Sequence, residues 1–202
     1  LIQSSGNWGA VRVVPRPSLA VDVIVSGEII ESTGETLKLK IGVRDATGRQ
    51  WYEKDYSALA SKYAYEDSFP QDIDAFQSIY KEITDDLLEY RLTLSKADVQ
   101  RIRAVAEMRF AQSFSSEAFG EHVSQEESGQ YRLLKLPSED DPMLASVRKV
   151  REREYLFIDT ICPDMPMYVD RERFWSLVVF RVLSRNAAPI RINVCDISSH
   201  YE

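Results

Sequence analysis

The side chains that most often carry chemistry in enzymes are sparse in this chain. Its 202 residues include two histidines, His122 and His200, and two cysteines, Cys162 and Cys195. Neither histidine has a serine, cysteine or aspartate beside it in a motif typical of a nucleophile and its base. No cluster has the spacing of metal ligands. We therefore expect both histidines to be solvated surface residues, and we predict no catalytic, cofactor-binding or metal-binding residue.

The two cysteines leave two alternatives open. Cys162 and Cys195 lie in the same C-terminal third of the chain. They can close one loop through a disulfide, or they can be two unpaired core residues. They do not form a Cys-x-x-Cys pair, so the sequence gives no indication of a zinc site or a thioredoxin-type site.

Acidic residues that are neighbours in the sequence are the remaining candidates for acid–base chemistry. Two carboxylates that face a cleft can hydrolyse a glycosidic bond. Each group also has a simpler interpretation, either as the water-facing side of a helix or as negative charge at a helix start, where the helix dipole favours it. We therefore predict no catalytic role for them. The groups are Asp85–Asp86, Glu126–Glu127 and Glu139–Asp140–Asp141.

Composition and charge exclude several classes of partner. The net charge is −7 and the isoelectric point is near 5.0, whereas phosphate backbones are bound by clustered lysine and arginine. We therefore expect no nucleic-acid partner. The basic residues from Arg148 to Arg153 alternate with glutamate, which is typical of a solvated, salt-bridged helix face. No run of about 20 apolar residues is present, so we predict no transmembrane segment.

The clearest structural signal is a series of three strands between Val21 and Tyr56. Valines alternate with Asp22 and Ile24 from Val21 to Val25, and apolar residues alternate with lysine or glycine from Leu37 to Val43. An aromatic run follows from Trp51 to Tyr56. Turn-forming residues that end in Gly34 and Gly48 separate the runs. This pattern predicts an antiparallel meander with one buried face and one wetter face. We expect Trp51 to belong to the core.

Helices are expected after the meander. Asp74 is placed to cap a helix to Leu94 whose apolar stripe fits the buried face of the sheet. Ser95 to Asp98 resembles a capping box that opens a second helix. Asp141 and Pro142 are typical of the start of a third helix. The apolar positions expected for these three helices are Phe76, Ile79, Tyr80, Ile83, Leu87 and Leu94, then Val99, Ile102, Ala106, Phe110 and Phe114, then Leu144, Val147, Tyr155 and Ile158.

These elements predict an α+β fold in three parts. Residues 1–94 would form a sheet domain with a helix packed across one face of an antiparallel meander. Residues 95–161 would form a helical extension, and 162–202 a C-terminal segment with a possible β-hairpin formed by 175–183 and 190–197. We expect a further strand from Trp8 to Val14 beside the meander. Because the chain opens on what resembles a helix end, we also expect that a strand and a helix precede it.

The first 94 residues resemble a known family. Ala20 to Ile29, then Leu37 to Val43, then Asp45 to Arg49, follow a pattern of alanine, aspartate and apolar residues, a strand, and Asp-x-x-Gly. This pattern is similar to the amino-terminal domain of TolB and to envelope lipoproteins of the CsgG and PelC type. The resemblance implies a sheet crossed by a helix, a non-enzymatic role, a location in the periplasm or at the inner leaflet of the outer membrane, and a lipid anchor on a preceding segment.

We therefore expect a bacterial cell-envelope accessory or assembly protein that acts through protein–protein interaction, with protein partners or with itself. Two alternatives stay open. One is a carboxylate-dependent hydrolase with a cleft between the sheet and the helices. The other is an interaction domain in the cytoplasm.

Overall fold

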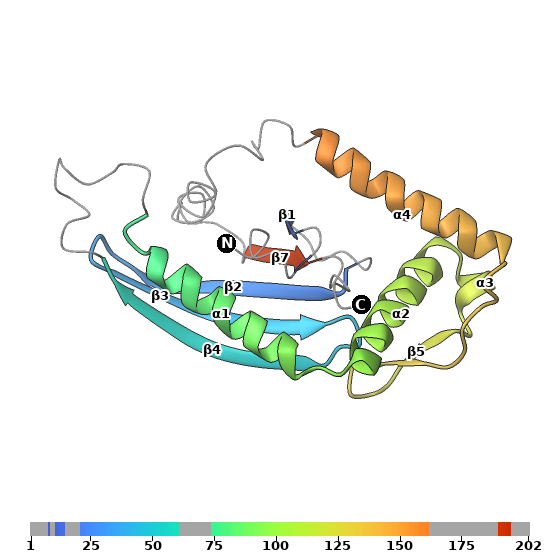
Figure 1. Ribbon diagram of the computed structural model, residues 1–202, viewed down its shortest axis with the longest axis horizontal. Helices are drawn as coiled ribbons and strands as arrows, with labels where there is room; N and C mark the ends of the chain where they lie inside the picture. Colours follow the sequence, from blue (N-terminus) through green and yellow to red (C-terminus); the bar gives the residue numbers. More distant parts are fainter. Residues whose placement is uncertain (1–7, 9–10, 15–20, 61–73, 162–189, 195–202) are drawn as a thin grey trace.

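The computed structural model describes residues 8, 11–14, 21–60, 74–161 and 190–194 (Figure 1). Within these ranges, side chains are described except those of 12–14, 154–161 and 190–194. The fold is α+β, as the sequence predicts: an antiparallel sheet, one helix across it, and further helices at one end. The described helices include none that is long and apolar enough to cross a membrane. Cys162 and Cys195 lie outside the described residues.

Five strands form the main sheet in the order β1–β7–β2–β3–β4, and every pair is antiparallel. Their bounds are Val11–Val14 for β1, Val23–Ser32 for β2, Thr36–Asp45 for β3, Gln50–Leu59 for β4 and Ile190–Val194 for β7. The three long strands are the predicted meander. The residues from 190 are a strand, as expected, and this strand joins the main sheet. The proposed partner strand at 175–183 lies outside the described residues.

The prediction that the N-terminal strand lies directly beside the meander is wrong. β1 pairs only with β7, and β7 pairs with β2 through Val23 to Gly27. A strand about 180 residues further along the chain therefore separates β1 from β2. Pattern within one segment carries no information about which distant strand will pair with it, because the backbone hydrogen bonds of a sheet are the same for any partner.

The buried face of the sheet is the predicted one. Leu37, Leu39, Ile41 and Val43 of β3 are all buried, and the helix α1 (Gln77–Thr93) lies across them and across β4 (Figure 1). Burying each such side chain stabilises the fold by about 1.5–3 kcal/mol. The stripe Ile79, Tyr80, Ile83 and Leu87 is buried as expected.

The other face of the sheet meets solvent. Lys38 forms an ion pair with Glu31, and Lys40 forms one with Glu53, while the side chain of Arg44 is exposed. These pairs join neighbouring strands across the face. Side chains of opposite charge on adjacent strands are typical of a sheet surface in contact with water.

A β-bulge lets the aromatic residues of β4 face the same way. Val43 pairs with Tyr52 and Arg44 pairs with Gln50, so Trp51 is an extra residue in β4. Consecutive residues of a regular strand point to opposite faces, but the bulge turns Trp51 inward beside Tyr52. The Trp51 ring stacks on Tyr90 of α1 with centroids 5.0 Å apart, and Trp8 lies 6.3 Å from Trp51. The prediction that Trp51 is a core residue is confirmed.

The second helix begins at the predicted capping box. α2 spans Lys96–Phe114, the Ser95 hydroxyl accepts from the Asp98 N–H, and the Asp98 carboxylate accepts from the Ser95 N–H. Its buried residues include Ile102 and Ala106, as expected. Phe114 was expected in the same stripe but is 54% exposed, because α2 ends there and α3 (Ser116–Phe119) turns away from its axis. Phe119 of α3 is buried.

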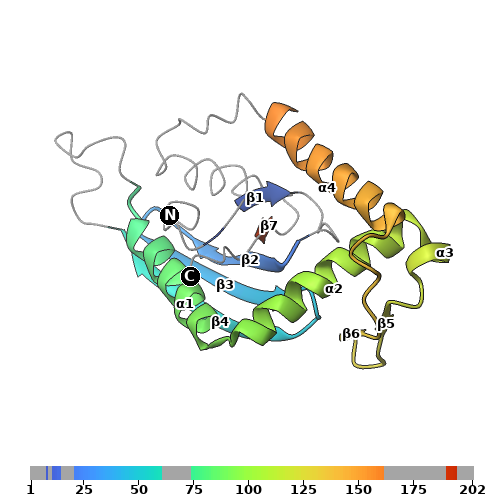
Figure 2. The same ribbon diagram turned by 45° about the vertical axis from the view of Figure 1, so that its right-hand side comes forward.

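Two short strands follow α3 and lie against α2. β5 (Val123–Gln125) and β6 (Tyr131–Leu133) form a hairpin (Figure 2). The helix α4 (Pro142–Ile161) then begins at the predicted cap, where the Asp141 carboxylate accepts from the N–H groups of Met143 and Leu144. Leu144 and Val147 are buried as expected.

The basic run of α4 forms salt bridges, as expected, but its recorded partners lie on other elements. Arg148 donates two hydrogen bonds to the Glu107 carboxylate of α2, at 2.6 and 3.1 Å. Arg151 lies 3.8 Å from the buried carboxylate of Asp22. These ion pairs connect α4 with α2 and with the residue that precedes β2.

One smaller expectation about the helices needs correction. α1 begins at Gln77, not directly after Asp74, because the Asp74 carboxylate accepts from the Phe76 N–H in a local turn. Such a turn competes with helix formation for the same backbone groups. The apolar positions Tyr155 and Ile158 of α4 lie where side chains are not described.

Candidate binding pocket at the turn between β3 and β4

The turn between β3 and β4 is organised around one buried carboxylate. The side chain of Asp45 is fully buried and accepts hydrogen bonds from four donors. These are the backbone N–H and hydroxyl of Thr47, Nε of Arg49 at 3.1 Å and Nε1 of Trp51 at 2.9 Å. A buried charge is costly unless it is paired and hydrogen-bonded, and here both conditions are met. The turn therefore has one fixed geometry.

The hairpin of β5 and β6 lies directly against this turn. The Tyr131 N–H donates to the Thr47 carbonyl at 2.6 Å. Gly48 has a φ of +84°, and a Cβ built there would lie 2.7 Å from the carbonyl oxygen of Gly129. Glycine is therefore required at position 48 for two reasons: the backbone has a positive φ there, and the two turns approach each other closely.

One arginine of α2 joins the same three elements. Arg109 donates through Nη1 to the carbonyl of Ala46 at 2.7 Å, and its guanidinium stacks over the Tyr131 ring at 3.9 Å from the centroid. Desolvation by burial lowers the pKa of Arg109 from its ordinary value. An arginine that bonds a backbone carbonyl and an aromatic face at once fixes the helix, the turn and the hairpin relative to each other.

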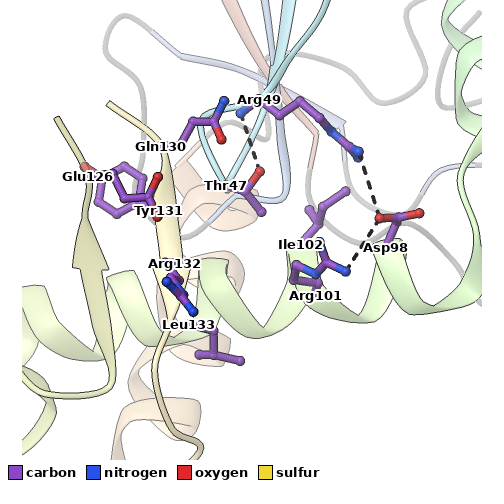
Figure 3. Close-up of a pocket in the computed structure, with 10 residues that line it drawn as sticks. All are labelled: Thr47, Arg49, Asp98, Arg101, Ile102, Glu126, Gln130, Tyr131, Arg132 and Leu133. Atoms are coloured by element: carbon purple, nitrogen blue, oxygen red, sulfur yellow. Dashed lines mark hydrogen bonds and ion pairs between the residues drawn. The ribbon is translucent and has the colours of Figure 1, made fainter. Parts of the chain in front are cut away.

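A pocket of about 480 Å³ opens between these three elements (Figure 3). Its volume is in the range of about 300–1,000 Å³ typical of ligand sites. The turn, the first half of α2 and the β5–β6 hairpin each contribute part of the wall. The lining residues are Thr47 and Arg49, then Asp98, Arg101 and Ile102, then Glu126, Gln130, Tyr131, Arg132 and Leu133.

Arginines outnumber carboxylates on this wall, although the chain as a whole is acidic. Arg49 and Arg101 approach the same oxygen, Oδ1 of Asp98, at 3.9 and 4.0 Å (Figure 3). Both distances exceed the 2.7–3.2 Å of a hydrogen bond. The part of the chain that the structure describes provides no ion-pair partner for Arg132. The pocket therefore presents guanidinium groups whose hydrogen-bonding capacity is partly unused.

Asp98 is held in its charged form. Hydrogen bonds from the Ser95 hydroxyl and the Ser95 N–H, with a smaller contribution from the two arginines, lower the pKa of Asp98. A carboxyl group that is ionised at neutral pH accepts hydrogen bonds and attracts cations but does not act as a general acid. The arrangement is suited to holding a ligand through charge and hydrogen bonds.

The residues considered for chemistry in the sequence lie apart from one another. Asp85 is exposed on α1, and Asp86 accepts from Lys54 and Tyr56 of β4 at 2.6 and 2.7 Å. Glu139 and Asp140 precede α4. Glu126 is the member of the acidic groups that lines the pocket. Within the described ranges, no group of three or more His, Cys, Asp or Glu side chains is arranged to hold a metal ion.

The expectation that His122 is a solvated surface residue is wrong. His122 is 9% exposed, packs against Phe119 with ring centroids 5.7 Å apart, and its Nδ1 lies 3.1 Å from the carbonyl oxygen of Lys135. The polar composition of 117–130 concealed α3 and β5, which lie on either side of His122 and pack against α2. His200 lies outside the described residues.

The pocket residues were not identified in the sequence because they come from three separate segments. Arg49, Arg101 and Arg132 are each about 30 to 50 residues apart and share no motif. The signals that could have indicated the site are indirect. The glycine in the turn at position 48 and the capping box at Ser95 place Arg49 and Asp98 at the ends of elements, where sites are often built.

No protein-family model, no curated protein sequence and no solved structure matches the chain. Function is therefore inferred from the pocket and from the fold around it.

Proposed function

We propose that this chain is a non-enzymatic accessory or assembly protein of the bacterial cell envelope and that it acts by binding other proteins. The observation that carries the proposal is the pocket beside the β3–β4 turn, with arginines from three segments on a rigid frame. Sites on rigid elements bind with a smaller loss of conformational entropy than sites on free loops. The partner is another protein or a second copy of this chain.

The cell-envelope part of the proposal is supported by the arrangement of the sheet and its helix. The resemblance to the TolB amino-terminal domain and to CsgG- and PelC-type lipoproteins implies a meander crossed by a helix. In this chain α1 lies across β3 and β4 in that way (Figure 1). We propose a periplasmic location or one at the inner leaflet of the outer membrane, with a lipid anchor on a segment before residue 1.

Photocrosslinking in living cells tests the binding role. A photoactivatable phenylalanine derivative replaces Gln130, which lines the pocket, and in a matched strain it replaces Arg153, which is exposed on α4 and does not line the pocket. We expect irradiation to give a discrete adduct from position 130 and none from position 153. The adduct's mass distinguishes a foreign partner from a second copy.

Either of two results would contradict the proposal. One is the absence of an adduct from position 130, and the other is an identical set of adducts from both positions. Fractionation of the same cells tests the location, because recovery of the full-length protein in the cytoplasmic fraction would favour the cytoplasmic interaction domain instead.

A second candidate function, a carboxylate-dependent hydrolase, is favoured by one observation. Asp98 and Glu126 both line the pocket, between the sheet and α2. The lowered pKa of Asp98 suits a carboxylate that acts as base or nucleophile, and Glu126 is the second carboxyl group of the pocket. Turnover of aryl glycosides that Glu126→Gln abolishes, with the fold intact by circular dichroism, would establish this function in place of the binding role.

A further inference from the structure

We propose that the pocket binds an acidic segment of a partner protein, one that carries a glutamate or aspartate next to an apolar side chain. This inference rests on the proposed binding function and names the chemistry of the partner. It is carried by three arginines, an internal carboxylate and a few apolar side chains that line the same pocket.

Arg49 is oriented in advance for a carboxylate. Its Nε donates to the fully buried carboxylate of Asp45, and its terminal nitrogens point along the wall of the pocket toward Asp98 (Figure 3). A guanidinium that is already anchored loses little side-chain entropy when a ligand arrives, and its planar fork suits a carboxylate. Arg49 is therefore a preorganised receptor group.

Asp98 occupies part of the place that a ligand carboxylate would take. Its Oδ2 is held by Ser95, while its Oδ1 faces Arg49 and Arg101 at 3.9 and 4.0 Å. At these distances it partly balances the two positive charges without satisfying their N–H donors. A ligand carboxylate at hydrogen-bond distance would make the bonds that Asp98 does not make. Asp98 is thus an internal competitor that weakens binding.

The β5–β6 hairpin supplies the third arginine of the pocket and most of its apolar side chains. Arg132 is exposed, and no described carboxylate pairs with it. Ile102 is buried and Leu133 is half-buried, and both line the pocket together with Tyr131. An apolar ligand side chain next to the carboxylate would cover the accessible parts of Leu133 and Tyr131, whereas inorganic phosphate would not use them.

Charge argues against a nucleic acid as the occupant. The chain has a net charge of −7, which repels a polyanion at long range, and Asp98 and Glu126 lie among the arginines. A short segment with one or two carboxylates has less of this repulsion and still meets the three guanidinium groups.

Isothermal titration calorimetry with the purified chain tests the inference. The probe is a capped pentapeptide of alternating glutamate and leucine, and the control peptide has glutamine in place of every glutamate. We expect saturable binding of the glutamate peptide, weakened at least about tenfold by the glutamine replacement. Raising the salt from about 50 to about 500 mM should weaken binding several-fold, because exposed charges are screened.

Variants of single residues give the site-specific readout. Arg101→Ala and Arg132→Ala should each weaken binding about fivefold to tenfold, whereas Arg153→Ala on α4 should leave it unchanged. Asp98→Asn should strengthen binding about threefold, because the side chain keeps an acceptor for the Ser95 N–H but loses its charge. Circular dichroism melts of every variant establish that the fold is retained.

Three results would overturn the inference: equal affinity for both peptides, equal affinity of the Arg132→Ala and wild-type chains, and displacement of the peptide by inorganic phosphate at peptide-like concentrations. An adduct from position 130 in cells together with no binding of the acidic probe would refute the acidic partner alone. The absence of the adduct together with the absence of probe binding would refute the binding function as well.

Discussion

At the scale of single residues, Asp45 is the side chain on which the pocket depends. It gathers four donors from the turn and from Trp51, and it anchors Arg49, yet its carboxylate touches no solvent. Asp45→Ala would leave the Trp51 indole N–H buried without an acceptor. An unsatisfied buried donor costs about 1–3 kcal/mol, and a broken network costs more.

We expect Asp45→Ala to lower the free energy of unfolding by about 2–4 kcal/mol. The measurement is urea denaturation followed by tryptophan fluorescence. The control is Asp55→Ala, whose carboxylate is exposed on β4 and should change stability by less than about 0.5 kcal/mol. Equal effects of the two substitutions would show that the Asp45 network adds nothing to stability.

Two glycines offer a second test at this scale, because they share a backbone conformation but not an environment. Gly48 and Gly129 have φ values of +84° and +82°. A Cβ at Gly48 meets the Gly129 carbonyl oxygen at 2.7 Å, while one at Gly129 meets nothing within 4 Å. Gly129→Ala should cost only the strain of about 1 kcal/mol, and Gly48→Ala should cost at least about 1 kcal/mol more. Thermal melts of both variants compare them, and a smaller effect at position 48 would rule out the close contact.

Single residues were predictable from sequence where their role is local. The capping box at Ser95 and the cap at Asp141 follow from neighbours a few residues away. The burial of Trp51 was expected from its large ring, although the bulge opposite β3 and the contact with Tyr90 that produce it are not local. His122 and Phe114 were misjudged because their burial depends on elements elsewhere in the fold. The pocket arginines were missed for the same reason, since arginine at a solvated position and arginine at a site have identical local patterns.

At the scale of elements, an ionic cluster joins α1 to the edge strand β4. Lys54 contacts Glu82 and Asp86 at 3.1 and 2.6 Å, and the Tyr56 hydroxyl donates to Asp86 at 2.7 Å. Burial acts to raise the pKa of Asp86, but the hydrogen bonds from Lys54 and Tyr56 outweigh it and hold the pKa below its ordinary value. The same cluster places charge at a sheet edge, which discourages pairing with other strands.

The direction of this shift fixes the pH dependence of stability. A carboxyl group whose pKa is lower in the folded state binds fewer protons there than in the unfolded state near pH 4. Its contribution to stability is complete above the unfolded pKa and is lost as the pH falls through the folded pKa. Asp86→Asn should therefore be less stable than wild type at pH 7, with the difference shrinking between about pH 5 and pH 3. Urea denaturation across this range measures it, and a constant difference would contradict the assignment.

Elements with strong periodicity were predictable, and pairings between distant elements were not. The meander and α1 follow from alternation and from a helical stripe within about 75 residues. The insertion of β7 between β1 and β2 joins segments from opposite ends of the chain. The attachment of the β5–β6 hairpin to the β3–β4 turn likewise depends on Gly48 and Arg109, whose contacts lie far away in sequence.

At the scale of the whole molecule, the open face of the sheet and the pocket at the β3–β4 turn differ in how their charged side chains are paired. The face opposite α1 carries cross-strand ion pairs such as Lys40 with Glu53, in which the charges satisfy one another. The pocket at the β3–β4 turn carries arginines whose donors are incompletely used. We therefore expect partners to bind at the pocket and not at the open sheet face.

The most direct test of this central claim is a nuclear magnetic resonance titration of the ¹⁵N-labelled chain with the glutamate–leucine pentapeptide. We expect saturable shifts of the amide signals of Thr47, Arg101 and Gln130, with those of Lys38 and Asp55 on the sheet unchanged. Shifts confined to the sheet residues, or no saturable shifts at all, would contradict it.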